Sequence, residues 1–190
     1  MRSKTGFTYL LALLALALSA PSASAQSGGT VGPTDPAAPT TPTTPAAGAT
    51  TPGSRAKLTK RGMAIAPADA PQAVKDAIAA GNRIRKKPYI WGGGHASFNA
   101  KGYDCSGAVS YVLNAAGLLA SPIPSGPLMK WGLPGRGSWI SVYANPGHTY
   151  AVIAGLRWDT SAMGSGGKGP RWRATKRSPR GFAERTYSGF

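Results

Sequence analysis

Histidine, cysteine and acidic residues are all scarce in this chain of 190 residues. There are two histidines, one cysteine and six acidic residues, against 22 lysines and arginines. The single cysteine, Cys105, excludes an internal disulfide, so its thiol is free, paired with another molecule or used chemically. The chain also lacks the paired His and Cys spacings that zinc sites usually have. We therefore expect neither a metal nor a cofactor.

Long hydrophobic runs are missing beyond the first residues. The one apolar run, from about Phe7 to Leu18, is shorter than the roughly 20 residues that cross a bilayer. It follows Arg2 and Lys4 and precedes small residues ending in Ala23-Ser24-Ala25. This order is typical of a secretory signal peptide over residues 1–25, and it predicts a secreted protein, extracellular or in the cell wall. An uncleaved signal acting as a membrane anchor is the alternative.

Charge is almost absent from residues 26–54, where Pro, Thr, Ala, Gly and Ser surround a single carboxylate, Asp35. Such a segment lacks the apolar surface to offset its ordering entropy, so we predict a disordered linker. Residues 55–190 remain, and a chain of that length fits one domain.

Positive charge is in excess, with a formal net charge of +16. A strongly basic exported protein is attracted to polyanions. The export signal favours anionic wall polymers or phospholipid head groups over nucleic acid, and a solvated basic surface is the alternative. We expect a basic C-terminal tail, because the cations gather there: Arg157, Lys168, Arg171, Arg173, Lys176, Arg177, Arg180 and Arg185.

Upstream of the cysteine, the sequence predicts a helix over 71–87 followed by a loop. Apolar residues recur there at helical steps, and Pro71 suits the first helical position. Pro88 ends this helix, Tyr89–Trp91 is predicted to be extended, and Gly92–Gly94 predicts a tight loop.

Cys105 lies where a second helix is predicted to begin, in KGYDCSGAVSYVLNAAGLL. Asp104 stands at the N-cap, and Gly117 suits a left-handed cap after the last turn. Cys105 would then lie near unpaired backbone amides at the positive end of the helix dipole. This position favours the thiolate, the reactive form, and the same amides can stabilise an oxyanion. A small buried cysteine without chemistry is the alternative.

Thiol catalysis usually needs an imidazole that accepts the thiol proton and later protonates the leaving amine. The two candidates are His148 and His95. His148 follows a predicted strand over 138–143 and a turn at Asn145-Pro146-Gly147, and it begins a second predicted strand. A histidine at a strand start can face a cleft, whereas His95 lies in the glycine loop, so we favour His148. An ordinary surface histidine is the alternative for both.

A third polar group should orient the imidazole. Asp104 is used at a helix start, and Asp69 and Asp76 belong to the first predicted helix. Asp159 is the remaining carboxylate close to His148 along the chain, and Asn145 is a rival.

The combination of PYIWGGG, YDCSG at a helix start and GH at a strand start resembles the NlpC-type cell-wall cysteine peptidases, over Tyr89 to Asp159. The resemblance implies a papain-like α+β fold: N-terminal helices packed on a small antiparallel sheet, with the cysteine at a helix N-terminus and the histidine on the sheet. It also implies hydrolysis of amide bonds in peptidoglycan stem peptides, often between D-glutamate and diaminopimelate.

By position, the resemblance implies Cys105 as the nucleophile and His148 as the base. Tyr89 matches a tyrosine that hydrogen-bonds substrate, while Asp104 and Ser106 match residues that help to bind the free amine end of a stem peptide. The plainer alternatives are a core tyrosine, a helix cap and a first-turn serine.

The chain departs from the family pattern after the histidine, where Thr149-Tyr150-Ala151 replaces the usual Val-Gly-Ile. The third polar residue of the family, commonly histidine, would fall near Asp159 or Thr160. An insertion over 121–137 and the basic tail also lie outside the motif.

These observations predict a secreted, monomeric cysteine endopeptidase or amidohydrolase that acts on peptidoglycan stem peptides, with Cys105, His148 and Asp159 as its catalytic residues. Two other functions are open: a non-catalytic basic wall-binding module, and an acyltransferase that uses the same Cys/His pair.

Overall fold

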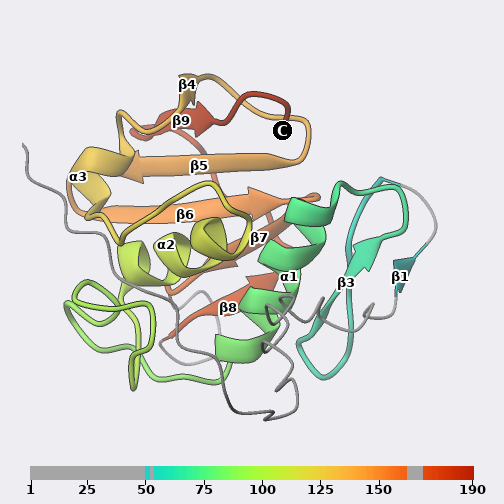
Figure 1. Cartoon of the computed structure of the whole chain (residues 1–190), viewed down its shortest axis with the longest axis horizontal. Helices are drawn as coiled ribbons and strands as arrows, with labels where there is room; N and C mark the ends of the chain where they lie inside the picture. Colours follow the sequence, from blue (N-terminus) through green and yellow to red (C-terminus); the bar gives the residue numbers. More distant parts are fainter. Residues whose placement is uncertain (1–49, 52–53, 162–168) are drawn as a thin grey trace, which may run out of the picture. The chain divides into compact units, whose positions relative to one another are not determined.

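The computed structural model describes residues 50–51, 54–161 and 169–190. Its main part has two layers, in which helices cover one face of an antiparallel sheet (Figure 1). The helices are α1 (Gln72–Ile84), α2 (Cys105–Ala115) and α3 (Ser125–Leu128). The predicted α+β architecture is thus confirmed, with Cys105 at the start of a helix. None of the described helices is long and apolar enough to cross a membrane.

The large sheet has the strand order β4-β9-β5-β6-β7-β8, and every neighbouring pair is antiparallel. Its strands are β4 (Leu133–Pro134), β5 (Ile140–Asn145), β6 (His148–Ile153), β7 (Leu156–Asp159), β8 (Arg171–Arg173) and β9 (Ala183–Thr186). β5 and β6 form a hairpin in which Asn145 pairs with His148. This hairpin puts His148 at one end of the sheet.

A second, small sheet lies beside α1, with the order β1-β3-β2. It is formed by β1 (Thr50–Thr51), β2 (Lys57–Leu58) and β3 (Ala64–Pro67), and β1 runs parallel to β3. β1 belongs to the end of the predicted linker, so the chain adopts a strand before residue 55. The predicted signal peptide and the rest of the linker, apart from Ser54, lie outside the described residues.

The first helix is shorter than predicted. It runs over Gln72–Ile84 instead of 71–87, with Pro71 at the N-cap position. Residues 89–91, predicted to be extended, belong to no described strand, and a turn begins at Trp91. The strand predicted over 138–143 begins two residues later and continues to Asn145.

The basic C-terminal segment is not a tail. It contributes β8 and β9, and Trp172 on β8 packs against Trp158 with ring centroids 4.8 Å apart. The Thr186 hydroxyl on β9 donates a hydrogen bond of 2.8 Å to the Ile140 carbonyl. Apolar and hydrogen-bonding residues that alternate with the arginines therefore hold this segment in the sheet.

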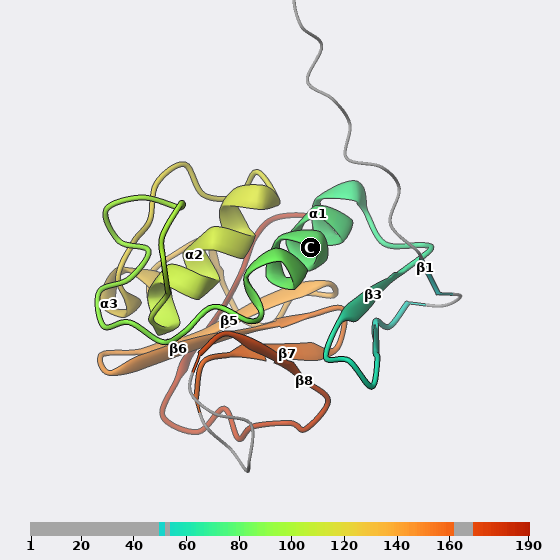
Figure 2. The same ribbon diagram turned by 90° about the horizontal axis from the view of Figure 1, so that it is seen from below.

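The core lies between the sheet and the helices. Val109, Val112 and Leu113 of α2 are buried there, together with Val142 and Ala151, which pair across β5 and β6. Because side chains alternate along a strand, Tyr143 and Tyr150 lie on the opposite face of the sheet. Figure 2 shows the helices on one side of the sheet and the segment directly after β8 on the other.

Trp158 joins the helix that carries Cys105 to the sheet, because its indole N–H donates a 2.9 Å hydrogen bond to the Ala108 carbonyl. Its side chain is fully buried. We expect Trp158→Phe to lower the free energy of unfolding by about 1–3 kcal/mol, through the lost hydrogen bond and the cavity left behind. Denaturant unfolding measures this change.

The matched control is Trp91→Phe, because Trp91 is 85% exposed. We expect its free energy of unfolding to stay within about 0.5 kcal/mol of the unchanged protein. Equal effects of the two substitutions would contradict the role given to Trp158.

Candidate active site

Asp104 fixes the start of α2 and the glycine loop at the same time. Its Oδ1 accepts a hydrogen bond from the Gly107 amide at 2.8 Å, as the predicted N-cap requires. Its Oδ2 accepts one from the Gly92 amide at 3.1 Å, and its own amide donates to the Gly93 carbonyl at 3.1 Å. These contacts hold the residue that follows, Cys105, in one place.

Two glycines allow the loop to lie directly on the helix start. A Cβ on Gly107 would collide with the carbonyl oxygen of Gly93. Gly94 has a φ of 86°, a conformation that favours glycine, and a Cβ there would come within 2.7 Å of the Tyr103 ring. The glycine-rich stretch is therefore a packing requirement of the site.

Cys105 is the first residue of α2, and its thiol is free and buried, with 8% of the residue exposed. The first amides of a helix have no partner within the helix, and they point toward the N-terminus. A reacting carbonyl placed against Cys105 would have these amides as hydrogen-bond donors.

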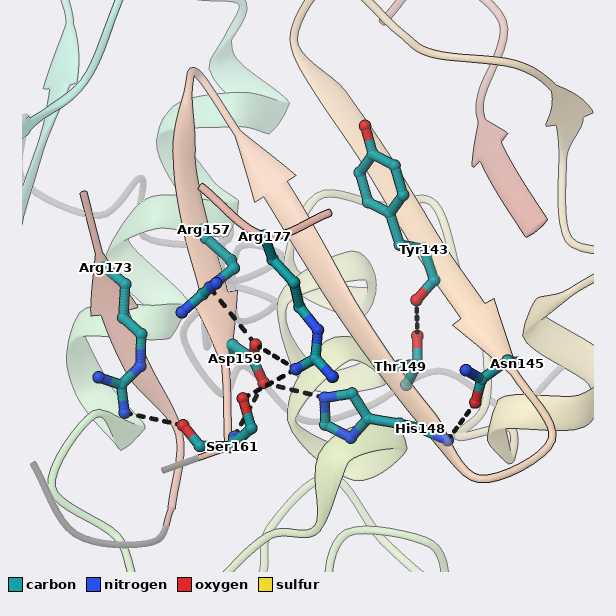
Figure 3. Close-up of polar contacts among 9 residues, drawn as sticks. All are labelled: Tyr143, Asn145, His148, Thr149, Arg157, Asp159, Ser161, Arg173 and Arg177. Carbon is teal, nitrogen blue, oxygen red and sulfur yellow. Dashed lines mark hydrogen bonds and ion pairs between the residues drawn. The ribbon is translucent and has the colours of Figure 1, made fainter. Parts of the chain in front are cut away.

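His148 begins β6, and its backbone is fixed by the turn before it. The Asn145 side-chain oxygen accepts hydrogen bonds from the Gly147 amide at 3.0 Å and the His148 amide at 2.8 Å. Asn145, the alternative candidate for the residue that orients the imidazole, thus stabilises the turn instead. The imidazole Nε2 lies 3.0 Å from Asp159 Oδ1, while the other ring nitrogen points away from the carboxylate (Figure 3).

The imidazole interacts with Cys105 as well as with Asp159, and its pKa reflects both contacts. Burial lowers the pKa of His148, but hydrogen bonds with Asp159 and Cys105 and their charges outweigh it and raise the pKa from 6.5 to about 9. Burial raises the pKa of Asp159, but hydrogen bonds from His148 and the Ser161 amide outweigh it and lower the pKa to about 2. The geometry thus favours an imidazolium paired with a carboxylate.

The side chain of Asp159 is fully buried among hydrogen-bond donors. Its Oδ2 lies 3.2 Å from Arg177 Nη1 and 3.4 Å from Arg157 Nε, and its Oδ1 accepts a 2.8 Å hydrogen bond from the Ser161 amide. Arg177 Nη1 also donates to the Ser161 hydroxyl at 2.9 Å. The carboxylate therefore has little freedom to turn away from His148.

His95 contacts the two residues beside the cysteine. Its Nε2 lies 2.9 Å from Asp104 Oδ2 and 2.9 Å from the Ser106 hydroxyl. Sequence reasoning did not predict this contact, because His95 lies nine positions before Asp104. Burial, followed by electrostatic interaction with Cys105 and Asp104, raises the pKa of Tyr89.

The structure brings together Cys105, His148 and Asp159, and it places Tyr89, Asp104 and Ser106 around the cysteine. Sequence reasoning missed Arg177, which looked like one of many basic residues near the C-terminus. Its guanidinium group lies beside two aromatic rings, 5.4 Å from the Tyr150 centroid and 5.2 Å from that of Phe182, and the Tyr150 contact is distant in sequence. Within the described residues, no group of three or more His, Cys, Asp or Glu could hold a metal ion.

No protein-family model and no curated protein matches the sequence. The fold is similar to solved mycobacterial structures. A hypothetical invasion protein of Mycobacterium tuberculosis is 23% identical, with 60% of this chain and 62% of that chain covered and a TM-score of 0.44. The peptidoglycan hydrolase RipB of that organism is 25% identical, with 60% and 64% covered and a TM-score of 0.45.

RipD of M. tuberculosis is 21% identical, with 62% of this chain and 98% of that chain covered and a TM-score of 0.43. It is described as a non-catalytic NlpC/p60 domain protein adapted to peptidoglycan binding. The chain spans less than two thirds of the length of the invasion protein and of RipB.

The contact between His148 and Asp159 predicts how the His148 ring titrates. We expect the His148 ring to titrate near pH 9 by nuclear magnetic resonance, and to titrate at lower pH in Asp159→Asn, which lacks the charge that stabilises the imidazolium. Because the pKa is higher in the folded state than in the unfolded state, the pair stabilises the protein below about pH 6.5, and this contribution is lost as the pH rises toward 9.

His95→Gln serves as the control that assigns the two histidine signals. An unchanged His148 titration in Asp159→Asn would contradict the coupling between the two side chains.

Proposed function

We propose that this chain is a secreted cysteine hydrolase that cleaves an amide bond in peptidoglycan stem peptides. Cys105 is the nucleophile, His148 the acid and base, and Asp159 the residue that orients the imidazole. One observation carries the proposal: a single imidazole interacts with the thiol at a helix start and, through Nε2, with a buried carboxylate.

The tautomer and orientation of the imidazole follow from the Asp159 contact. Because Nε2 faces Asp159 at 3.0 Å, Nδ1 is the nitrogen left to exchange a proton with Cys105. A carboxylate on the far nitrogen stabilises the imidazolium that forms when the thiol loses its proton. Arg177 and the Ser161 amide keep that carboxylate in place.

The reaction has two steps. In the first, the Cys105 thiolate adds to the amide carbonyl carbon, the amides at the start of α2 stabilise the oxyanion, and His148 gives its proton to the leaving amine as the C–N bond breaks. In the second, His148 takes a proton from water, the hydroxide adds to the thioester, and the C–S bond breaks to release the acid and restore the Cys105 thiolate beside a protonated His148.

The substrate part of the proposal rests on the predicted export and on the motifs shared with cell-wall peptidases. Tyr89 interacts electrostatically with Cys105, and we assign to it a hydrogen bond to the substrate, as the shared motif implies. Asp104 and Ser106 offer a carboxylate and a hydroxyl to an amine, but both contact His95. A substrate amine would have to displace the His95 imidazole from these two groups.

Removing the thiol tests the nucleophile. We expect Cys105→Ala to abolish the release of stem-peptide fragments from purified peptidoglycan, measured by mass spectrometry, because the acyl intermediate forms on the Cys105 sulfur. Circular dichroism and denaturant unfolding of the variant serve as the folding control.

Fragments that persist in Cys105→Ala would contradict the proposal. Intact peptidoglycan with salt-sensitive binding by the unchanged protein would instead favour a wall-binding module. A product in which an amine has replaced water would identify an acyltransferase.

The two histidines offer a matched pair of variants. We expect His148→Ala to lower kcat by roughly 10²–10⁴, the usual contribution of a general acid and base. We expect His95→Ala to act mainly on KM, since its contacts are with Asp104 and Ser106 and not with the thiol. The reverse pattern would assign the proton transfers to His95.

A further inference from the structure

A pocket of about 250 Å³ lies on the face of the sheet opposite the helices. Tyr143 on β5 and Tyr150 on β6 line it, and their rings are stacked with centroids 4.7 Å apart. Residues 174–177 and Pro179, which follow β8, provide another part of the lining. The pocket therefore lies on the other side of the sheet from α2.

The charges around this pocket are strongly unbalanced. Glu184 pairs with Arg136 at 2.9 Å, and Asp159 is shared by Arg157 and Arg177. No carboxylate lines the pocket, and among the described residues none lies within ion-pair distance of Arg55 or Lys176. The pocket has five cationic lining residues: Arg55, Arg136, Arg157, Lys176 and Arg177.

Two donors in the lining lack an acceptor. The Tyr150 hydroxyl is buried without a hydrogen-bond partner within the described residues, and only 1% of the residue is exposed. Arg177 uses Nη1 for Asp159 and Ser161, which leaves its Nε and Nη2 donors without an acceptor in the described part of the chain. Of these groups only the Tyr150 hydroxyl is buried, and a buried donor without a partner is rare in folded proteins, whereas the Arg177 side chain is partly exposed and open to an acceptor from outside.

We propose that this pocket binds a phosphoryl group, as a free phosphate or a phosphate ester. Guanidinium groups match the oxygens of phosphate as bidentate donors, and several of them here surround a space that no acidic side chain enters. Tyr150, which also lines the pocket, carries a neutral donor in its hydroxyl. The site is separate from Cys105 and does not depend on the proposed hydrolase activity.

An adjoining pocket of about 450 Å³ offers room for the group that is esterified to the phosphate. It shares Arg55, Arg136 and Tyr143 with the first pocket and adds the hydroxyl-bearing Ser138 and Ser141. A polar group such as glycerol therefore suits it, and glycerol phosphate should bind at least as tightly as inorganic phosphate.

Calorimetric titration of the purified protein with inorganic phosphate and with glycerol phosphate tests the proposal. The test variant is Arg55→Gln with Lys176→Ala, because neither side chain contacts Asp159 or His148. We expect both ligands to bind about 10-fold more weakly to it, since two charged donors are lost. The control, Lys60→Ala with Lys101→Gln, removes the same charge from exposed positions outside the pocket and should bind as the unchanged protein does.

Three results would overturn the proposal: no saturable binding of either phosphate, equal weakening in the control variant, or acetate binding as tightly as phosphate.

Vesicles of phosphatidylglycerol distinguish the sources of the phosphoryl group. Vesicle binding that is lost in the test variant alone identifies a lipid head group, whereas binding of glycerol phosphate without vesicle binding identifies a soluble or polymer-borne ester. Peptidoglycan cleavage, measured in parallel, should be the same in the test variant as in the unchanged protein.

Discussion

The buried carboxylate of Asp159 is the constraint on which the arrangement of the site depends. A charge removed from water is costly unless donors surround it, and the side chain of Asp159 is fully buried. Three cationic side chains and one backbone amide meet this need, and they come from β6, from β7 with the residues directly after it, and from the segment that follows β8. Satisfying one carboxylate therefore fixes the relative positions of three parts of the chain.

The two proposed reacting groups are held by different layers. Cys105 is positioned by Asp104 and the glycine loop, whereas His148 is positioned by the turn at Asn145 and by Asp159. A change in the distance between helix and sheet would separate the thiol from the imidazole. Trp158 opposes such a change, because it lies next to Asp159 in β7 and bonds to Ala108 in α2.

The parts of the site that the sequence predicted are those set by neighbouring residues. An N-cap at Asp104 and a left-handed cap at Gly117 depend on a few residues each, and both are present, with Gly117 at a φ of 73°. The strand that begins at His148 follows from a local turn signal and is also present. The antiparallel sheet beneath the helices came from the resemblance of the motifs to a known family, since no local pattern specifies strand order.

The contacts that the sequence did not predict join residues distant along the chain. Arg177 reaches Asp159 across 18 positions, and the segment from β8 to β9 was expected to be a tail because its charge density hides the buried positions of Trp172 and Thr186. A basic run usually forms a solvated surface, but this one also supplies a side chain that contacts the buried Asp159. Arg177 donates through Nη1 to Asp159 and also lines the outer pocket. One arginine can do both because its donors form a rigid planar fork, whereas a lysine offers a single point charge.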